Sequence, residues 1–394
     1  MTDLRDDVRE AFHERYGHKP LGVWSAPGRV NLIGEHTDYN EGFVLPFAID
    51  RRTLVAAGPR HDSTLRIGST FDDPDNLYME VGLADLDGIQ EAGASPLEWG
   101  AYPVGVAWAL SRFGADLAAV PGVDLMFDSN VPVGAGLSSS AAIECAVALA
   151  LDDMWRLDLT RPQLAQAGRL AENDFVGAPT GIMDQSASLL GARDTAVLLD
   201  CRSLETESVP LGFDEAGLAV LVIDTGVKHE HASGGYGDRR ASCERAAVLM
   251  GVPALRDLTV ADLDRAEDKL GDETFRRLRH VVTEDQRVLD AVAALRAHDH
   301  AALGELLDAS HASMRDDFEI STPELDLAVE IARENGALGA RMTGGGFGGA
   351  AIALVRVDDI SRVQVAVDGG FAEHGFGQPE VFTVAASDGA ARDA

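Results

Sequence analysis

Hydrophobic residues follow two different periods along the chain, one helical and one typical of strands. The N-terminal stretch MTDLRDDVREAFHERYG has the pattern of an acidic amphipathic helix. Short β-branched or alternating runs follow it and are typical of an antiparallel sheet: LGVWSAP, FVLPFAI, TLVAAGP, TLRIGST and VDLMFDS. Between the first two runs we expect a polar loop over residues 28–42.

Helical patterns dominate the middle and the end of the chain. Residues 99–113 and the Ala-rich residues 140–155 have helical periodicity. Thr160 and Gln163 have the spacing of a capping box, which predicts another helix that ends near Asp174. Two strands, TAVLLDC and LAVLVID, are followed by several charged amphipathic helices, the apolar strand AAIALVRV, and a closing helix and strand.

The order of these elements bounds the fold class and the number of domains. Helices grouped around mixed strands, without regular β-α-β alternation, indicate an α+β fold. A length of 394 residues is too great for one ordinary core and suits two domains. We place the boundary near Pro210, between the two central strands, which gives domains of residues 1–210 and 211–394.

The chain is strongly acidic, with a formal net charge of −32 from 33 Lys and Arg against 65 Asp and Glu. Such a surface repels phosphodiester backbones and anionic lipids, so we expect no nucleic acid and no membrane as partner. No apolar run is long enough to span a bilayer, the N-terminus lacks a signal-peptide pattern, and the three cysteines are widely spaced. These features predict a cytoplasmic protein without a disulfide framework, and we expect a monomer or a weak homodimer.

The same acidity would repel ATP, so a nucleotide site needs a local source of positive potential. The three lysines, Lys19, Lys228 and Lys269, lie outside any G-x-x-x-x-G-K-[ST] sequence, which excludes a P-loop lysine. The segment PVGAGLSSSAA can supply the potential, because its glycines let the backbone approach a ligand and the helix after it points N–H groups at the loop. Its serines can bind phosphate oxygens or magnesium. The alternative is a serine-capped helix after a flexible turn.

A second candidate site is the loop GRVNLIGEHTDYNEG, residues 28–42. It gathers polar and charged side chains, including Arg29, Glu35, His36 and Asp38, and fixed hydrogen-bonding groups at this density suit a polyhydroxyl ligand. The alternative is a solvated surface loop. Apolar residues at its centre and apolar strands on both sides favour a binding site.

Two further segments carry candidate chemistry. In AENDFVGAPTGIMDQ, Glu172 ends one helix, and Asp184 follows a loop that contains glycine and proline. Asp184 is either a helix cap or a general base for a hydroxyl, with Glu172 on magnesium in the second case. In GARMTGGGFGGA, five glycines occupy the six positions 344–349, which favours a loop that passes close to another group over a mobile linker.

In this order, the four segments resemble the motifs of the GHMP small-molecule kinases. PVGAGLSSSAA and MTGGGFGG are similar to the phosphate loop and the C-terminal glycine motif of that family. GRVNLIGEHTDYNEG and GIMDQ are similar to motifs of the galactokinases within it. The resemblance implies an ATP-dependent sugar 1-kinase that acts on D-galactose. It also implies an N-terminal domain of mixed sheet and helices, a ferredoxin-like C-terminal domain, and an active site between them.

The resemblance assigns roles residue by residue. Asp184 would be the catalytic base, and Arg29 would neutralise charge beside it. The other assignments are Glu35, His36, Thr37, Asp38, Gly181 and Tyr236 for the sugar; Pro132, Val133, Gly134, Ala135, Gly136, Leu137, Ser138, Ser139 and Ser140 for the phosphates of ATP; and Ser140 and Glu172 for Mg²⁺. Some relatives carry Cys at the position of Thr180 or His at that of Asn173, and neither difference touches these groups.

Two alternatives stay open. One is a related kinase for another sugar, such as arabinose or N-acetylgalactosamine, although the string HTDYNEG favours galactose. The other is a non-catalytic sensor that binds galactose and ATP and contacts a regulator. Such sensors have lost small residues from the serine loop, whereas GLSSSAA is intact here.

Overall fold

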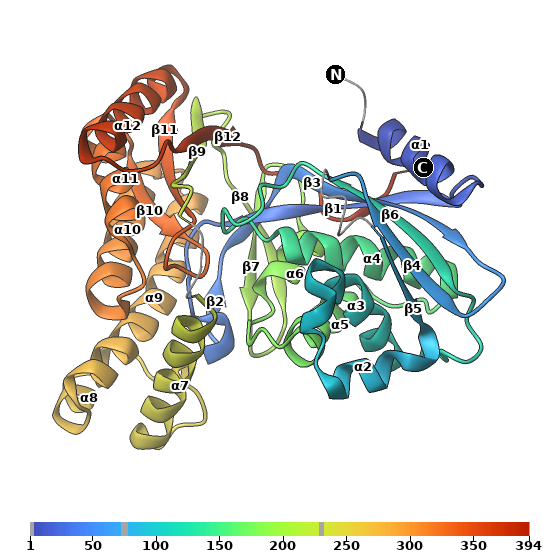
Figure 1. Cartoon of the computed structure of the whole chain (residues 1–394). Coiled ribbons are helices and arrows are strands. Elements are labelled where there is room, and N and C mark those ends of the chain that lie inside the picture. The colour runs from blue at the N-terminus through green and yellow to red at the C-terminus, as the bar shows by residue number, and fades with distance from the viewer. Residues whose placement is uncertain (1–3, 72–77, 228–231, 394) are drawn as a thin grey trace.

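The structure, a computed structural model, describes residues 4–71, 78–227 and 232–393. Figure 1 shows two lobes side by side, one built on a six-stranded sheet and the other on a four-stranded sheet. A small sheet of β2 (Phe43–Val44), β7 (Thr195–Asp200) and β8 (Thr206–Pro210) lies between them. Within the described ranges, no helix is both long and apolar enough to cross a membrane.

The N-terminal lobe is a sheet with helices on both faces. The strand order is β13-β1-β3-β6-β4-β5, antiparallel except for the parallel pair of β4 and β6. These strands are β1 (Gly22–Asn31), β3 (Pro46–Pro59), β4 (Thr64–Ser69), β5 (Tyr78–Gly82), β6 (Val123–Ser129) and β13 (Ala391–Arg392). The helices are α1 (Leu4–Tyr16), α2 (Leu86–Ala92), α3 (Ala101–Ser111), α4 (Ser139–Trp155), α5 (Arg161–Leu170) and α6 (Met183–Leu190). In Figure 1, α1 lies on one face of the sheet and α3 to α6 lie on the other, around a core that includes Trp24, Val55, Leu125 and Val147.

Two strands run further than their patterns predict. β1 continues through Gly28 to Asn31, where we expected a loop, and its register with β3 shifts between Pro27 and Arg29. A Cβ atom at Gly28 would lie 2.5 Å from the carbonyl oxygen of Leu137, so glycine allows the strand to pass directly beside the serine loop. The predicted run FVLPFAI is divided: Phe43–Val44 form the separate strand β2, and its end continues through TLVAAGP as the single strand β3.

The helix predictions hold in this lobe, with one difference at an end. The Thr160 N–H donates to Oε1 of Gln163 over 2.9 Å, which confirms the capping box at the start of α5. α5 ends at Leu170, before the predicted end near Asp174. The chain goes on as a π-helical turn, Ala171–Val176, and this turn carries Glu172.

The C-terminal lobe has the ferredoxin-like arrangement that the resemblance implies. Its antiparallel sheet has the order β10-β11-β9-β12, as in a β-α-β-β-α-β unit. Its strands are β9 (Leu218–Asp224), β10 (Gly339–Thr343), β11 (Ala350–Arg356) and β12 (Glu380–Val384). Its helices are α7 (Ala232–Met250), α8 (Leu263–Lys269), α9 (Asp272–Arg296), α10 (His300–Ser313), α11 (Pro323–Glu334) and α12 (Ile360–His374). Leu221, Met342, Phe318 and Phe371 are part of its core.

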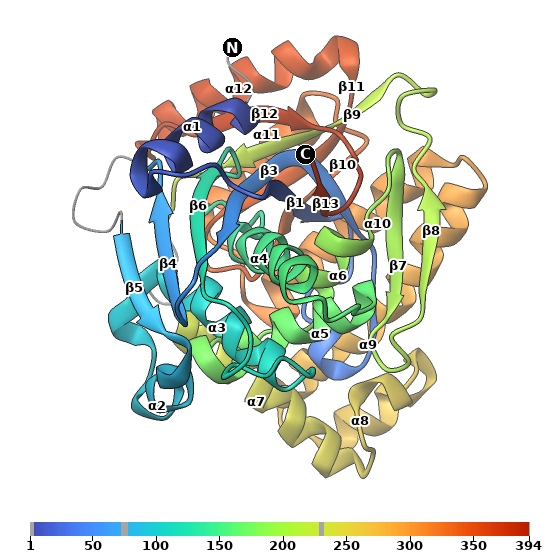
Figure 2. The ribbon, with the colours of Figure 1, turned by 90° about the vertical axis from the view of Figure 1, so that its right-hand side faces the viewer.

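The chain does not end in the C-terminal lobe. Its last strand, β13, pairs with β1 in the sheet of the N-terminal lobe, and Figure 2 shows the two strands side by side. The pairing of β13 with β1 therefore holds the end of the C-terminal lobe against the N-terminal lobe. The boundary near Pro210 falls between β8 and β9 and stays a prediction.

Helix α10 and strand β10 contact each other through their backbones. A Cβ atom at Gly304, in α10, would lie 2.2 Å from the carbonyl oxygen of Leu338. One at Gly339, in β10, would lie 2.1 Å from the carbonyl oxygen of Gly304. These two glycines set the distance between the helix and the sheet, because neither position has room for a methyl group.

We therefore expect Gly304→Ala to destabilise the protein by about 1–3 kcal/mol through overpacking. Gly369 in α12 is a matched helical control, since no atom lies within 4 Å of a Cβ atom there. Gly369→Ala should stabilise by about 0.5–1 kcal/mol, the ordinary preference for alanine in a helix. Urea unfolding of both variants measures the difference, and an equal effect at the two positions would contradict the packing argument.

Candidate active site

A cavity of about 370 Å³ opens between the lobes, at the end of β1 and the N-terminal ends of α4 and α6. Most of the predicted site residues line it: Arg29, Glu35, His36, Asp38, Gly134, Gly136, Leu137, Ser138, Ser139, Ser140, Glu172, Gly181, Asp184 and Tyr236. The C-terminal lobe contributes Tyr236 from α7 and the start of the glycine loop, Gly344, Gly345 and Gly346. Segments far apart in the sequence thus meet at one site.

Four predicted residues do not line this cavity: Thr37, Pro132, Val133 and Ala135. The hydroxyl of Thr37 lies 2.8 Å from the carbonyl oxygen of Gly34 and 2.6 Å from that of Phe43, so it shapes the loop from within. Ala135 is buried, whereas Val133 is 75% exposed and lines a neighbouring cavity.

Arg29 and Asp184 form a two-pronged ion pair at the wall of the cavity. The Arg29 Nε donates to Asp184 Oδ1 over 2.8 Å, and Nη2 donates to Oδ2 over 2.9 Å. The remaining nitrogen, Nη1, donates to the carbonyl oxygen of Gly136 over 2.5 Å. This parallel geometry fixes both side chains, and the carboxylate faces Arg29 instead of the N–H groups of α6, so Asp184 is not a helix cap.

Ser138 occupies the N-cap position of α4, but its side chain does not cap the helix. It precedes α4 with a left-handed backbone, φ 58°, and its side chain makes no capping hydrogen bond. Its hydroxyl donates instead to Oδ2 of Asp184. The N-terminal end of α4 therefore faces the cavity with the positive end of its dipole, as an anion-binding segment requires.

Ser140 and Glu172 lie together on the side of the cavity next to α4. The Ser140 hydroxyl donates to Oε1 of Glu172 over 3.3 Å, and Oε2 accepts from the Thr180 hydroxyl over 2.6 Å. Burial and the nearby Asp184 raise the pKa of Glu172. Within the described part of the chain there is no cluster of three or more His, Cys, Asp or Glu side chains for a metal. A hydroxyl and one carboxylate do fit Mg²⁺, which takes hard oxygen ligands and keeps positions for phosphates.

Asp38 and Gly181 are in direct contact. A Cβ atom at Gly181 would lie 1.8 Å from Oδ2 of Asp38, so only glycine leaves room for this carboxylate. The Tyr39 N–H donates to Oδ1 of Asp38 over 2.9 Å. Burial and the nearby Asp184 raise the pKa of Asp38 to about 6.

His36 is held in one tautomer by its partners. Its Nε2 lies 3.1 Å from the carbonyl oxygen of Gly345, so Nε2 carries the hydrogen, and Nδ1 accepts from the Tyr39 hydroxyl at 2.6 Å. Its ring packs at 4.8 Å from the Tyr236 ring. Burial lowers the pKa of His36 to about 3, so the ring is neutral.

Glu35 connects the loop over residues 28–42 to the C-terminal lobe, a contact that the sequence reasoning missed. Its Oε2 accepts from Nη2 of Arg341 in β10, and its Oε1 accepts from the Gly344 N–H over 3.0 Å. Arg341 is fully buried and also donates to the carbonyl oxygen of Leu32 over 3.0 Å. Arg341 lies in GARMTGGGFGGA, whose pattern indicates a loop, so the sequence contains no local signal of this buried ion pair.

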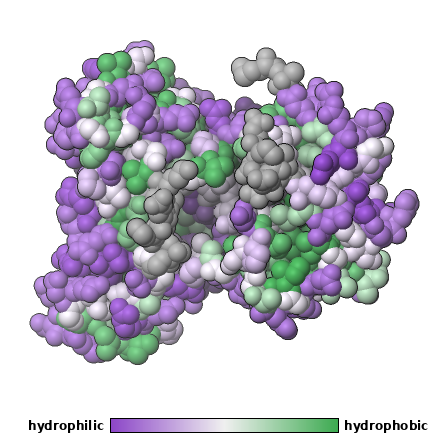
Figure 3. Space-filling model, viewed as in Figure 1, coloured by the Kyte–Doolittle hydropathy of each residue, from purple (hydrophilic) through white to green (hydrophobic). Residues whose placement is uncertain are grey.

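A second cavity, of about 430 Å³, adjoins the first and was also missed. The two share Tyr102, Ser139 and Ser140, and the second has a mainly apolar wall that includes Trp99 and Phe127. The rings of Trp99 and Phe127 meet edge to face, with centroids 5.7 Å apart. Figure 3 shows a hydrophobic area on the lobe that carries the six-stranded sheet, on an otherwise largely hydrophilic face.

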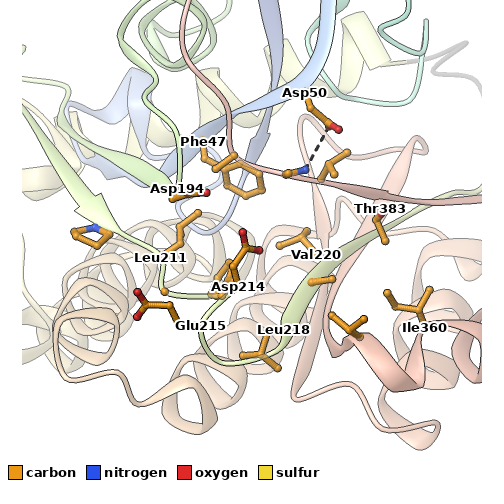
Figure 4. Close-up of a pocket in the computed structure, with 18 of the residues that line it drawn as sticks. Phe47, Asp50, Asp194, Leu211, Asp214, Glu215, Leu218, Val220, Ile360 and Thr383 are labelled. Atoms are coloured by element: carbon orange, nitrogen blue, oxygen red, sulfur yellow. Dashed lines mark hydrogen bonds between the residues drawn. The ribbon is translucent and has the colours of Figure 1, made fainter. Parts of the chain in front are cut away.

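A third cavity, of about 480 Å³, contains none of the predicted site residues. Figure 4 shows Asp50, Asp194, Asp214 and Glu215 around apolar side chains that include Phe47. No Arg or Lys of the described chain lines it, so its charge is wrong for a nucleotide.

Three segments match known families. Residues 10–59 match the family described as "Galactokinase galactose-binding signature". Residues 101–192 match "GHMP kinases N terminal domain", and residues 291–372 match "GHMP kinases C terminal".

Whole-chain comparisons agree with these matches. The chain is 52% identical over 387 residues to a galactokinase of Streptomyces coelicolor, covering 98% of this chain and 97% of that protein. It is 45% identical over 372 residues to a galactokinase of Mycobacterium bovis, covering 93% and 98%. The structure of Lactococcus lactis galactokinase complexed with galactose matches with a TM-score of 0.92 at 33% identity, covering 99% of this chain and 100% of that one. A Methanococcus jannaschii mevalonate kinase, with a TM-score of 0.64 at 18% identity over 93% and 98% of the two chains, shares the fold.

The raised pKa of Asp38 predicts a pH dependence of stability. Because its folded-state pKa of about 6 lies above the ordinary 3.8, the folded protein binds an extra proton between these pH values. The stability linked to that proton is fully present below the unfolded pKa and is lost as the pH rises through about 6. Asp38→Asn should therefore gain stability relative to the wild type between about pH 5 and about pH 8, measured by urea unfolding.

Glu284 supplies a control of opposite sign. Burial opposes the shift, but Arg287 and Arg341 lower the pKa of Glu284 to about 2. Ionised Glu284 stabilises the folded protein at pH values above its pKa in the unfolded chain. Glu284→Gln should therefore be less stable than the wild type at about pH 8. For each variant, the difference in unfolding free energy from the wild type is followed as the pH rises. If this difference changes in the same direction for both variants, the assignment of a raised pKa to Asp38 is wrong.

Proposed function

The chain belongs to the galactokinase family within the GHMP kinases, and we propose that it transfers the γ-phosphate of MgATP to the anomeric C1 hydroxyl of D-galactose. As a member of this family it is an ATP-dependent sugar kinase. The product would be galactose 1-phosphate, from the first phosphorylation step of galactose catabolism. The observation that carries the residue assignment is the contact of Arg29 with Asp184 at the wall of the cavity between the lobes.

Asp184 acts as the general base in this proposal. As the C1 oxygen bonds to the γ-phosphorus, its proton passes to Asp184, the bond from the γ-phosphorus to the β–γ bridging oxygen breaks, and ADP leaves. Oδ2 already accepts from both Arg29 and Ser138, whereas Oδ1 accepts only from Arg29 among the described contacts. Oδ1 therefore has the capacity to take the proton. Arg29 holds the carboxylate in place and offsets negative charge next to the transferring group.

The nucleotide extends from this point along the serine loop. Backbone N–H groups after Gly134 and the N-terminal end of α4 face the phosphates, and this replaces the absent P-loop lysine. Ser140 and Glu172 would hold Mg²⁺, which neutralises charge on the phosphates when bound. The apolar second cavity, with Trp99 and Phe127, suits the flat adenine base.

The sugar occupies the side of the cavity lined by Asp38, Gly181, His36 and Tyr236. The carboxylate of Asp38 is the acceptor that we assign to the C3 and C4 hydroxyls. The ring pair of His36 and Tyr236 provides an apolar surface beside it. Thr37 takes part only by shaping the loop.

The alternatives are less well supported. A non-catalytic sensor would not need Arg29 and Asp184 paired at the mouth of an intact serine loop. A kinase for arabinose or N-acetylgalactosamine is disfavoured by whole-chain identity to galactokinases. We expect the protein to act in the cytoplasm, in agreement with three free cysteines, and a monomer or weak homodimer stays a prediction.

ADP release, coupled to an optical readout, tests the function. With MgATP we expect turnover on D-galactose and little on D-glucose, L-arabinose or N-acetylgalactosamine. Asp184→Asn keeps the shape of the side chain but cannot take the proton, so kcat should fall by ~10²–10⁴-fold. Calorimetry should show that this variant still binds galactose. Loss of galactose binding together with turnover would mean that Asp184 has a structural role.

Asp38 gives a prediction on sugar discrimination. Galactose and glucose differ only at C4, and an epimer that leaves a buried acceptor unpaired can be rejected by ~10⁴–10⁵-fold. Asp38→Ala should lose galactose activity severely and bring the kcat/KM values for galactose and glucose closer together. A decrease by the same factor on both sugars would show that Asp38 supports the loop and does not distinguish C4.

A further inference from the structure

Gln185 follows the proposed base directly, yet it has no part in the transfer as described. It is fully buried on α6. Its Nε2 lies 2.8 Å from Oε2 of Glu144 and 2.9 Å from Oε2 of Glu172. An amide NH₂ group has two hydrogens, so Gln185 donates one to each carboxylate.

Glu144 is an unusual partner for such a contact. It is fully buried on α4, one helical turn after Ser140. Its Oε1 has no hydrogen-bond partner, and no Arg, Lys or His of the described chain forms an ion pair with it. A carboxyl group is unfavourable in the interior without such partners, and among the described contacts Gln185 supplies the hydrogen bond to its Oε2.

A glycine on a third helix leaves space for Gln185. A Cβ atom at Gly168, inside α5, would lie 2.9 Å from Cγ of Gln185. Glycine inside a helix is less favourable than alanine. Its presence at position 168 lowers helix stability but lets the aliphatic part of Gln185 approach the backbone of α5 closely. Three helices are thus arranged around one amide.

We propose that Gln185 is a positioning residue for the metal-binding carboxylate Glu172, with Glu144 as the buried acceptor that fixes the Gln185 amide. Gln185 and the Thr180 hydroxyl both donate to Oε2 of Glu172, which stops the carboxylate from rotating and leaves Oε1 toward Ser140. The inference rests on the proposed function only in its assignment of Mg²⁺ to Ser140 and Glu172. Partners of this kind typically change metal affinity by 10–100-fold when they are removed.

The test measures binding without turnover. Gln185→Met has a similar length and no donor, and the probe is Mn²⁺ with ADP, followed by electron paramagnetic resonance of the bound metal. We expect Mn²⁺ affinity in the presence of ADP to fall about 10–100-fold. Binding of ADP in EDTA and binding of galactose should not change. A purely structural role would weaken all three, and that result, or unchanged Mn²⁺ affinity, would overturn the proposal.

Ser188→Ala is the matched control. Ser188 is a buried residue of the same helix, and its hydroxyl donates to the carbonyl oxygen of Pro27 over 2.7 Å, away from Glu172. This variant should bind Mn²⁺ with ADP as the wild type does. In a Glu172→Gln background, Gln185→Met should add no further loss, because Gln185 acts through Glu172; a full additional loss would contradict that route.

Gly168→Ala decides the case if Gln185→Met does not fold. The added methyl group must displace the Gln185 stem while alanine itself suits the helix. Weaker Mn²⁺ affinity with a folded protein supports the proposal, and unchanged affinity overturns it. If Gln185→Met weakens the binding of Mn²⁺ with ADP as expected but the wild type does not phosphorylate galactose, the proposed function fails and this inference stands.

Discussion

One guanidinium group, that of Arg29 in β1, joins its strand to two other segments of the site. Its side chain holds Asp184 at the start of α6 and the carbonyl oxygen of Gly136 in the serine loop. Its backbone N–H donates to the carbonyl oxygen of Leu137 over 3.0 Å. Lysine cannot reproduce this, because a single ammonium group lacks the planar fork that meets two carboxylate oxygens in parallel. The position of Arg29 in turn depends on Gly28, which brings β1 against the loop.

The arrangement also accounts for an ATP-dependent kinase built on so acidic a chain. With a net charge of −32, long-range attraction of a triphosphate is not available. In the proposed site short-range groups would serve instead, since backbone N–H groups and a helix end act mainly on an anion already in contact. Ser138 adopts φ 58° and Phe347, in the glycine loop, φ 61°, which are unfavourable for residues with a side chain. Backbone strain at both loops that border the cavity fits a site where the exact direction of N–H and carbonyl groups matters more than local stability.

Sequence patterns predicted the features that depend on residues close together in the chain, such as helices, strands and caps. They missed the contacts between residues that are far apart in the sequence. The capping box at Thr160, helix α4 and the apolar strands are set by residues a few positions apart, and those predictions were confirmed. The contact of Glu35 with Arg341 joins residues 306 positions apart, and no local pattern encodes that separation. The extension of β1 to Asn31 was missed for a related reason, because Arg29, a charged residue that suggests a loop, is stabilised by the neighbouring serine loop. The placement of Thr37 inside its own loop likewise required the turn geometry, which the motif does not state.

Glu35 shows how the three loops around the cavity depend on each other. The resemblance gives it to the sugar, yet its two carboxylate oxygens already accept from Arg341 and from the Gly344 N–H. Gly344 in turn lies against the serine loop, since a Cβ atom there would be 3.1 Å from the carbonyl oxygen of Gly136, to which Arg29 also donates. These contacts link Arg29 to the serine loop, the serine loop to the glycine loop, and the glycine loop to Glu35. The chain itself connects Glu35 back to Arg29 in β1. A change at Glu35 would therefore reach the serine loop through the packing of Gly344 against Gly136. We expect the proposed sugar and nucleotide sites, both built mainly on the N-terminal lobe, to affect each other by this route.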